Sequence, residues 1–201
     1  MKTNIIMKSF ILILTLFCFI NMNAQENKDE KLPYYEITEE YETYTAGTVA
    51  ARVIDGLGFR YYWATEGLRD EDLAYRPSDM ARTTDETIEH LYGLSKIIVN
   101  STLKKPNIAG EEENLTFAEK RKKTLVNFKT AADILRASDD VSEYKLVFKN
   151  ENETFELPFW NNLNGPIGDA IWHCGQVISF RRSSGNPYNS KASVFTGKVS
   201  E

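Results

Sequence analysis

Four stretches of the chain repeat apolar residues at helical spacing, and one stretch alternates between apolar and polar residues. The first helix is predicted over about 46–67, with an apolar row that packs against the rest of the fold. The row consists of Val49, Val53, Leu57, Tyr61, Ala64 and Leu68. Two glycines inside the helix, Gly56 and Gly58, indicate close approach by a neighbouring element.

The second and third helices are each predicted to begin at a capping box, in which a threonine and a glutamate side chain cap each other's backbone N–H groups. The first box is Thr83 with Glu86, and the second is Thr116 with Glu119. The helices that follow are expected to end near residues 102 and 138. On the second helix, Ile88 and Leu91 belong to the apolar stripe and are expected in the core.

The alternating stretch, 141–159, predicts a β-hairpin whose strands lie within 144–148 and 154–159. A fourth helix is predicted to start near Pro166, because proline suits the first helical position, and to end before Gly185. Its apolar stripe places Ile171, Cys174 and Ile178 in the core. The predicted fold class is therefore all-α: a four-helix bundle with a short β-hairpin inserted before the last helix.

The four helices and the hairpin define a bundle domain over 46–190. An acidic and aromatic stretch, 25–45, is expected to lie on the domain as an extended arm, and 191–201 is expected to be a C-terminal tail.

The first 24 residues have the pattern of a secretory signal peptide. Lys2 and Lys8 precede an apolar run over 9–20, and Ala24 is small enough to precede the cleavage point. The run is shorter than the roughly 20 apolar residues that span a bilayer, so no membrane span is expected after its removal. We therefore expect an exported protein, periplasmic or secreted, although an uncleaved anchor or a lipid on Cys18 is an open alternative.

The 201 residues carry a formal net charge of −5, which argues against binding nucleic acid through a basic field. The basic run at 120–123 is accordingly predicted to be a solvated helix face. Removal of the signal leaves Cys174 as a single cysteine without a disulfide partner, and its place on an apolar stripe predicts a small buried hydrophobic residue. A homodimer is compatible with this composition.

The chain has two histidines, His90 and His173. Asp169 precedes His173 by four residues, so the two side chains are neighbours on one face of the fourth helix and can hold one cation. The alternative is a solvent-facing Asp–His pair together with a core histidine hydrogen-bonded to a carbonyl. The spacing leaves both interpretations open.

Residues 52–101, with TxxETIEHL from Thr83, and 168–187, with HxGQ from His173 followed by Arg and GNP, resemble the DinB-like superfamily of metal-binding four-helix bundles. The resemblance implies a divalent metal, zinc or nickel, held by three histidines. His90 matches the first ligand and His173 the last, while Asp169 stands at the middle position. A carboxylate there is a legitimate ligand that also admits iron or manganese, or else the metal has been lost.

Relatives of this kind are described as hydrolases, thiol transferases or isomerases, so the resemblance implies a metal-dependent, hydrolase-like enzyme acting on a small molecule. Glu86, one turn before His90, is the candidate base or supporting side chain. The candidate substrate-facing residues are Arg60, Tyr61, Gln176 and Arg181. The alternative function is a non-catalytic envelope protein that keeps the bundle for binding and carries no functional metal.

Overall fold

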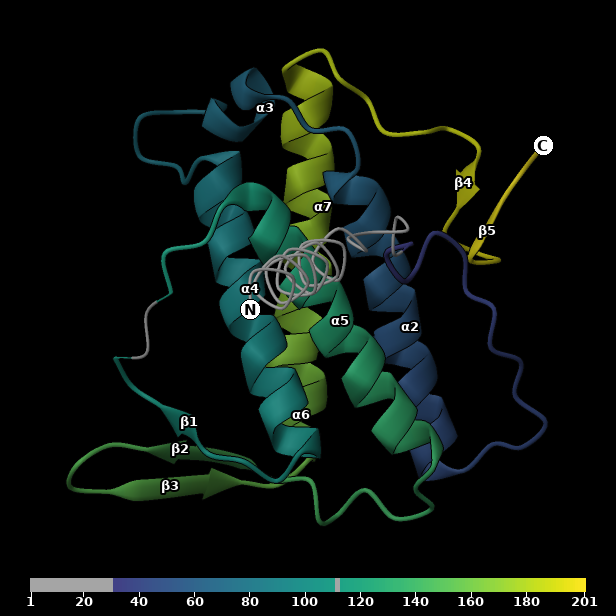
Figure 1. Cartoon of the computed structure of the whole chain (residues 1–201), viewed down its shortest axis with the longest axis vertical. Coiled ribbons are helices and arrows are strands. Elements are labelled where there is room, and N and C mark those ends of the chain that lie inside the picture. Colours follow the sequence, from purple (N-terminus) through teal and green to yellow (C-terminus); the bar gives the residue numbers. More distant parts are fainter. Residues whose placement is uncertain (1–30, 111–112) are drawn as a thin grey trace, which may run out of the picture. The chain divides into compact units, whose positions relative to one another are not determined.

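A computed structural model describes residues 31–110 and 113–201, and its longest elements are four helices (Figure 1). They are α2 (Ala46–Thr65), α4 (Thr84–Thr102), α5 (Phe117–Arg136) and α7 (Gly168–Ser183). A short helix, α3 (Asp70–Ala74), lies between α2 and α4. The prediction of a mainly helical chain with a few short strands is confirmed. The predicted signal segment, 1–24, lies outside the described residues.

Threonine side chains fix where three of the long helices begin. The predicted capping boxes at Thr83–Glu86 and Thr116–Glu119 are both present, and α2 begins at a further box formed by Thr45 and Thr48. In each box the threonine hydroxyl accepts a hydrogen bond from an N–H group that the first turn leaves without a helical partner. These caps explain why the observed starts of α4 and α5 agree with the sequence prediction.

Helix α2 packs against α5 and α7, and α4 packs against the same two helices. Near the C-terminal ends of both α2 and α7, the Arg181 guanidinium donates to the carbonyl oxygens of Trp63 and Ala64, each at 3.0 Å. Since the two C-terminal ends lie together, these two helices run in the same direction. Helices α4 and α5 also run in the same direction, because Lys120 pairs with Asp85 near the N-terminal ends of both helices and Asn127 donates to Ser95 further along both. The core lies between the four helices, and its fully buried side chains include Ile54, Leu57, Tyr61, Ile88, Leu91, Ile98, Leu125, Phe128 and Leu135.

The buried face of α2 is rotated from the predicted one at its N-terminal end. Val49 and Val53 are 51% and 38% exposed, whereas Ala50 and Ile54 are buried. Residues four positions apart on a helix of 3.6 residues per turn differ by about 40° in direction. Val49 is two such intervals before the buried Leu57, so its side chain points about 80° away from the core direction. Ile171 and Ile178 are predicted to lie in the core, but the structure shows them only partly buried. Ile88, Leu91 and Cys174 are buried as predicted.

The predicted hairpin is present as β2 (Leu146–Lys149) and β3 (Thr154–Leu157), paired antiparallel. A third strand, β1 (Asn107–Ile108), pairs parallel with β2 and was not predicted. Two residues are too short to show an alternating pattern, so the sequence carries no periodic signal for β1. The sheet lies beside the C-terminal part of α4 (Figure 1).

The entry into α7 differs from the prediction that the helix starts near Pro166. The helical path begins earlier, with α6 (Trp160–Asn162) and a π-helical turn, η1 (Leu163–Ile167), which contains Pro166. Gly165 within this turn has non-helical angles (φ −89°, ψ −111°), so the path kinks before Pro166 instead of starting there. Asp169 follows this kink and lies in the first turn of α7.

The arm lies on α2 over its described part. The ring of Tyr34 occupies the space where Gly58 has no side chain, which confirms the close approach predicted from that glycine. The hydroxyls of Tyr34 and Tyr41 donate to the buried carboxylate of Asp55, and Arg136 of α5 donates to both oxygens of that carboxylate, at 3.0 and 3.2 Å. The arm is thereby fastened to two helices.

The predicted C-terminal tail is partly ordered as a two-stranded sheet, β4 (Ala192–Ser193) with β5 (Lys198–Val199). Gly197 accepts a hydrogen bond from the backbone N–H of Ile37 at 2.8 Å, and a side chain at Gly197 would collide with Ile37. The tail and the arm therefore support each other.

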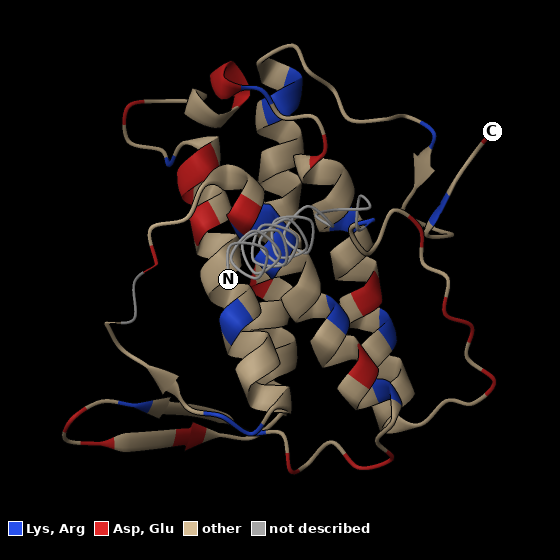
Figure 2. Ribbon diagram, viewed as in Figure 1, with Lys and Arg blue, Asp and Glu red and all other residues tan. Residues whose placement is uncertain are grey.

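Acidic and basic residues are interspersed over the helices (Figure 2). The run at 120–123 is not simply a solvated face, because the Lys120 ammonium is buried beside the carboxylates of Asp85 (3.0 Å) and Glu89 (3.2 Å), while Arg121 pairs with Glu66. Two of its four cations thus tie α5 to α4 and to α2. Within the described part of the chain, no helix is both long and apolar enough to cross a membrane.

Candidate metal centre

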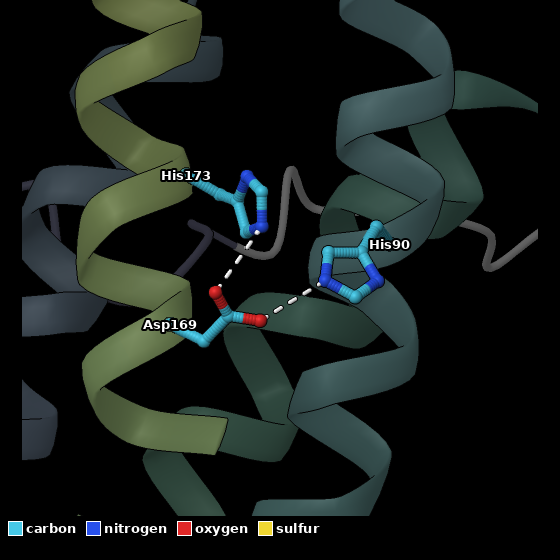
Figure 3. A group of neighbouring side chains, drawn as sticks. All are labelled: His90, Asp169 and His173. Atoms are coloured by element: carbon cyan, nitrogen blue, oxygen red, sulfur yellow. Dashed lines mark hydrogen bonds and ion pairs between the residues drawn. The ribbon is translucent and has the colours of Figure 1, made fainter. Parts of the chain in front are cut away.

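Two helices bring both histidines and one aspartate together (Figure 3). His90 projects from α4, and Asp169 and His173 project from α7 toward it. Nε2 of His90 lies 3.1 Å from Oδ2 of Asp169, and Nε2 of His173 lies 3.3 Å from Oδ1 of the same carboxylate. One potential ligand atom from each residue can be chosen so that all three lie within 4.8 Å of one another.

The local sequence explains this placement. Asp169 and His173 are one helical turn apart, so their side chains share a face of α7. That face is turned toward α4, and the two imidazole rings meet edge to face with their centroids 4.7 Å apart. The structure therefore brings together the three residues that the sequence predicts as metal ligands.

The centre is open to solvent on one side. The side chain of His173 is 14% exposed, whereas those of His90 and Asp169 are 34% and 37% exposed. A cation held by these three groups would thus keep positions for water or a small molecule, as catalytic metal sites do.

The second ring nitrogen of His173 is held by Gln176, one turn further along α7. Nδ1 of His173 lies 2.6 Å from Oε1 of Gln176, and because an amide oxygen only accepts, Nδ1–H is the donor. This hydrogen bond turns Nε2 toward Asp169 and, in the neutral ring, leaves a lone pair on it. The arrangement is the one that metal-binding histidines use to fix their tautomer.

The donor set fits a divalent cation. Ligand bonds of about 2.0–2.2 Å in a tetrahedral site place neighbouring ligand atoms about 3.3–3.6 Å apart. The two nitrogen–oxygen separations here, which end on different oxygens of Asp169, are 3.1 and 3.3 Å. Two imidazoles with one carboxylate and open positions suit zinc, iron or manganese. The same contacts also suit a metal-free arrangement in which protons on Nε2 of both rings are donated to Asp169.

Glu86 is engaged at the start of α4. Its carboxylate accepts a hydrogen bond from the backbone N–H of Thr83 at 2.7 Å and lies 3.8 Å from the Arg76 guanidinium. The hydrogen bond from the Thr83 backbone is the main cause that lowers the pKa of Glu86 from its ordinary value. A carboxylate with a lowered pKa is a poorer proton acceptor, so these contacts favour the capping role over the role of a base.

The four candidate substrate-facing residues separate into different environments. Tyr61 is fully buried, and Arg181 is 3% exposed with its guanidinium bound to backbone carbonyls, so neither of them can face a substrate. Arg60 lies on α2, in a groove on the other side of α7. Gln176 alone of the four contacts the centre, through His173, and its three-residue spacing from His173 was the signal for that contact.

Cys174 is adjacent to His173 in sequence but faces the core. It is 2% exposed, and burial raises the pKa of its thiol to about 12. A thiol in this state is neutral at physiological pH and therefore a poor nucleophile or metal ligand. The prediction of a small buried hydrophobic residue is confirmed.

No family model, curated protein or solved structure matches the chain.

Proposed function

We propose that this chain is an exported protein with a DinB-like four-helix bundle formed by α2, α4, α5 and α7. In this proposal His90, Asp169 and His173 hold one divalent cation, and the protein is a metal-dependent, hydrolase-like enzyme acting on a small molecule. The family assignment rests on the sequence motifs, and the cation on the side-chain geometry. The pairwise packing of the four long helices supports the bundle.

The observation that carries the proposal is the position of His173 between two acceptors. Oε1 of Gln176 lies 2.6 Å from Nδ1, and a carboxylate oxygen of Asp169 lies 3.3 Å from Nε2. A neutral ring has one N–H group and can satisfy only one of these contacts. A cation between Nε2 and the carboxylate removes the conflict while the ring stays neutral.

The protein residues would contribute in distinct ways. Asp169 supplies negative charge between the two rings, and Gln176 fixes the tautomer of His173. A cation in this position would polarise a substrate oxygen or acidify a bound water. The partial exposure of His90 and Asp169 leaves a small molecule access to the centre.

The same contacts also support the alternative, a non-catalytic envelope protein without a functional metal. If both histidines carry a proton on Nε2, each donates to one oxygen of Asp169, and no cation is required. The two functions differ in metal content and in turnover.

Elemental analysis of protein purified without a histidine tag tests the metal. We expect close to one equivalent of a divalent cation, lost on chelation and restored by titration with zinc, iron or manganese. His90→Ala and His173→Ala should abolish tight binding, while Glu86→Gln should keep it, because that carboxylate caps α4. A wild-type protein that takes up no cation would favour the metal-free alternative.

A panel of chromogenic carboxylic esters, amides and phosphoesters tests the hydrolase. We expect turnover of at least one class, proportional to bound metal and absent from His173→Ala. A loaded protein that turns over none of these classes would contradict the hydrolase while leaving the metal site intact.

A further inference from the structure

A second groove lies between α2 and α7, on the side of α7 away from the metal centre. Its apolar wall is formed by Phe59, Trp63, Ile171 and Ile178, and its volume is about 300 Å³. This volume is at the lower end of the range of about 300–1,000 Å³ that is usual for small-molecule sites, and the apolar and aromatic lining is also typical of them. We call it the α2–α7 groove.

Two arginines, Arg60 and Arg182, line this groove. The Arg60 guanidinium donates to the carbonyl oxygen of Gly56 on its own helix at 2.9 Å, and the Arg182 guanidinium lies 5.4 Å from the centre of the Tyr188 ring. Neither has a carboxylate partner among the described residues. By contrast, the partly buried Arg121 and Arg136 both pair with carboxylates. The groove therefore presents two uncompensated positive charges beside an apolar wall.

The C-terminal segment closes one side of the groove. Tyr188 and Val194 contribute to its lining. This segment is held in place through β4 and β5, and through the hydrogen bond between Ile37 and Gly197. The groove is thus formed by three separate parts of the chain and is preformed in the structure without a ligand.

We propose that the α2–α7 groove binds a small monocarboxylate with an aliphatic or aromatic body. The apolar body would displace water from the wall that Trp63 and Ile178 help to form. The carboxylate would accept charge-assisted hydrogen bonds from Arg60 and Arg182, whose planar guanidinium groups match a carboxylate in geometry. Since the named lining contains no aspartate or glutamate, no protein anion competes for these two arginines.

This site is independent of the proposed metal centre. At about 100° per residue, Ile171, Cys174 and Ile178 lie on the opposite side of α7 from Asp169 and His173. The groove would keep its function if no cation binds at the centre, and its failure would leave the metal proposal untouched.

Calorimetric titration with three probes that share an eight-carbon chain tests the chemistry. We expect octanoate to bind with one-to-one stoichiometry and with an affinity at least about tenfold higher than that of octan-1-ol. Octylammonium should bind most weakly of the three. Arg60→Gln and Arg182→Gln should each weaken octanoate by about tenfold and leave octan-1-ol nearly unchanged. Octanoate and octylammonium binding equally well, or no saturable octanoate binding at millimolar concentration, would overturn the proposal.

Gly175 offers a way to block the groove without disturbing the fold. It lines the groove, and a Cβ added there meets no atom within 4 Å. Gly175→Leu should therefore fill the groove while raising the helix propensity of α7, and octanoate binding should be lost. Unchanged octanoate affinity in a folded Gly175→Leu protein would place the ligand elsewhere and overturn the assignment.

Two controls separate occlusion from other effects of the substitution. Gly175→Ala should keep most of the octanoate affinity, because one methyl group leaves most of the groove open. Gly93→Leu makes the same change on α4, at a glycine with equally open surroundings that lines a different groove, and should leave octanoate binding unchanged. His90→Ala should also bind octanoate normally, since it alters only the metal centre.

Discussion

Gln176 accepts a hydrogen bond from Nδ1 of His173 at 2.6 Å, and this contact determines which nitrogen of the ring faces Asp169. Such a neighbour matters because a histidine that is free to rotate or to change tautomer loses part of its affinity for a cation. Gln176 is thus the side chain through which the metal proposal can be tested without removing a ligand.

Replacing Gln176 by leucine should weaken metal binding by about 10–100-fold, the usual effect of losing a partner that orients a metal ligand. Gln176→Glu retains an acceptor for Nδ1–H and should bind nearly as well as the wild type. The measurement is a competitive titration against a zinc chelator. Ser179→Ala is the matched control, because Ser179 is exposed on the same helix and its hydroxyl donates only to the carbonyl of Gly175. An unchanged affinity in Gln176→Leu would contradict the assigned tautomer.

Asp169→His should keep or strengthen zinc binding, because it replaces an oxygen ligand by a nitrogen ligand that zinc accepts well. Asp169→Ala should lose tight binding. Asp140→His is the matched control and should show no gain, since Asp140 is an exposed aspartate whose carboxylate, among the described residues, accepts hydrogen bonds from Ser142 alone. Chelator competition on the three variants gives the order directly. A loss of affinity in Asp169→His as large as that in Asp169→Ala would contradict the assignment of position 169 as a ligand.

The candidate centre could be predicted because its signals are short in range. Asp169 and His173 are four residues apart on one helix, and the chain offers one other histidine, His90, as a partner from elsewhere. The same reasoning could not separate a cation from shared protons, because both need the same residues in the same places. For Gln176 the sequence predicts a substrate-facing role, although its three-residue spacing from His173 also allows the contact that the structure shows.

Features that depend on distant parts of the chain could not be predicted. The carboxylate of Asp55 joins Tyr34 and Arg136, which are 21 and 81 residues away in sequence. No periodic pattern encodes such a network. Conversely, the helical row already placed Tyr61 on the apolar face of α2, so its assignment as a substrate-facing residue conflicted with a signal that the sequence contained.

Truncating core residues should affect stability in the order of their burial. Ile88→Ala should lower the free energy of unfolding by about 2–5 kcal/mol, because Ile88 is fully buried. Ile171→Ala should cost less, since Ile171 is only partly buried against the core and its side chain lines the α2–α7 groove. Urea denaturation followed by circular dichroism measures both. A larger loss for Ile171 than for Ile88 would contradict the described packing of α7.

If the protein is exported as proposed, the mature chain should begin near Gln25, because the small side chain of Ala24 suits the position before a signal-peptidase cleavage site. Intact mass and N-terminal sequencing of protein from the cell envelope give the start directly. Replacing Ala24 by a bulky residue such as leucine should slow the cleavage. A start at Met1 would indicate an uncleaved anchor, and a lipid on Cys18 would indicate a lipoprotein.

Asp72 should make stability depend on pH in the acid range. Its buried carboxylate accepts hydrogen bonds from Arg69, Ser184 and Asn186, and these bonds, chiefly the one from Arg69, hold its pKa well below the ordinary value. Because the folded pKa lies below the unfolded one, the stabilisation is fully present above the unfolded value of about 3.9 and declines as the pH falls below it. Asp72→Asn should therefore cost about 1–3 kcal/mol at pH 7 and progressively less below pH ~4, where the wild type loses the same contribution. Urea denaturation at a series of pH values checks the convergence. A destabilisation that stays constant down to pH ~2 would mean that Asp72 contributes through packing and not through its charge.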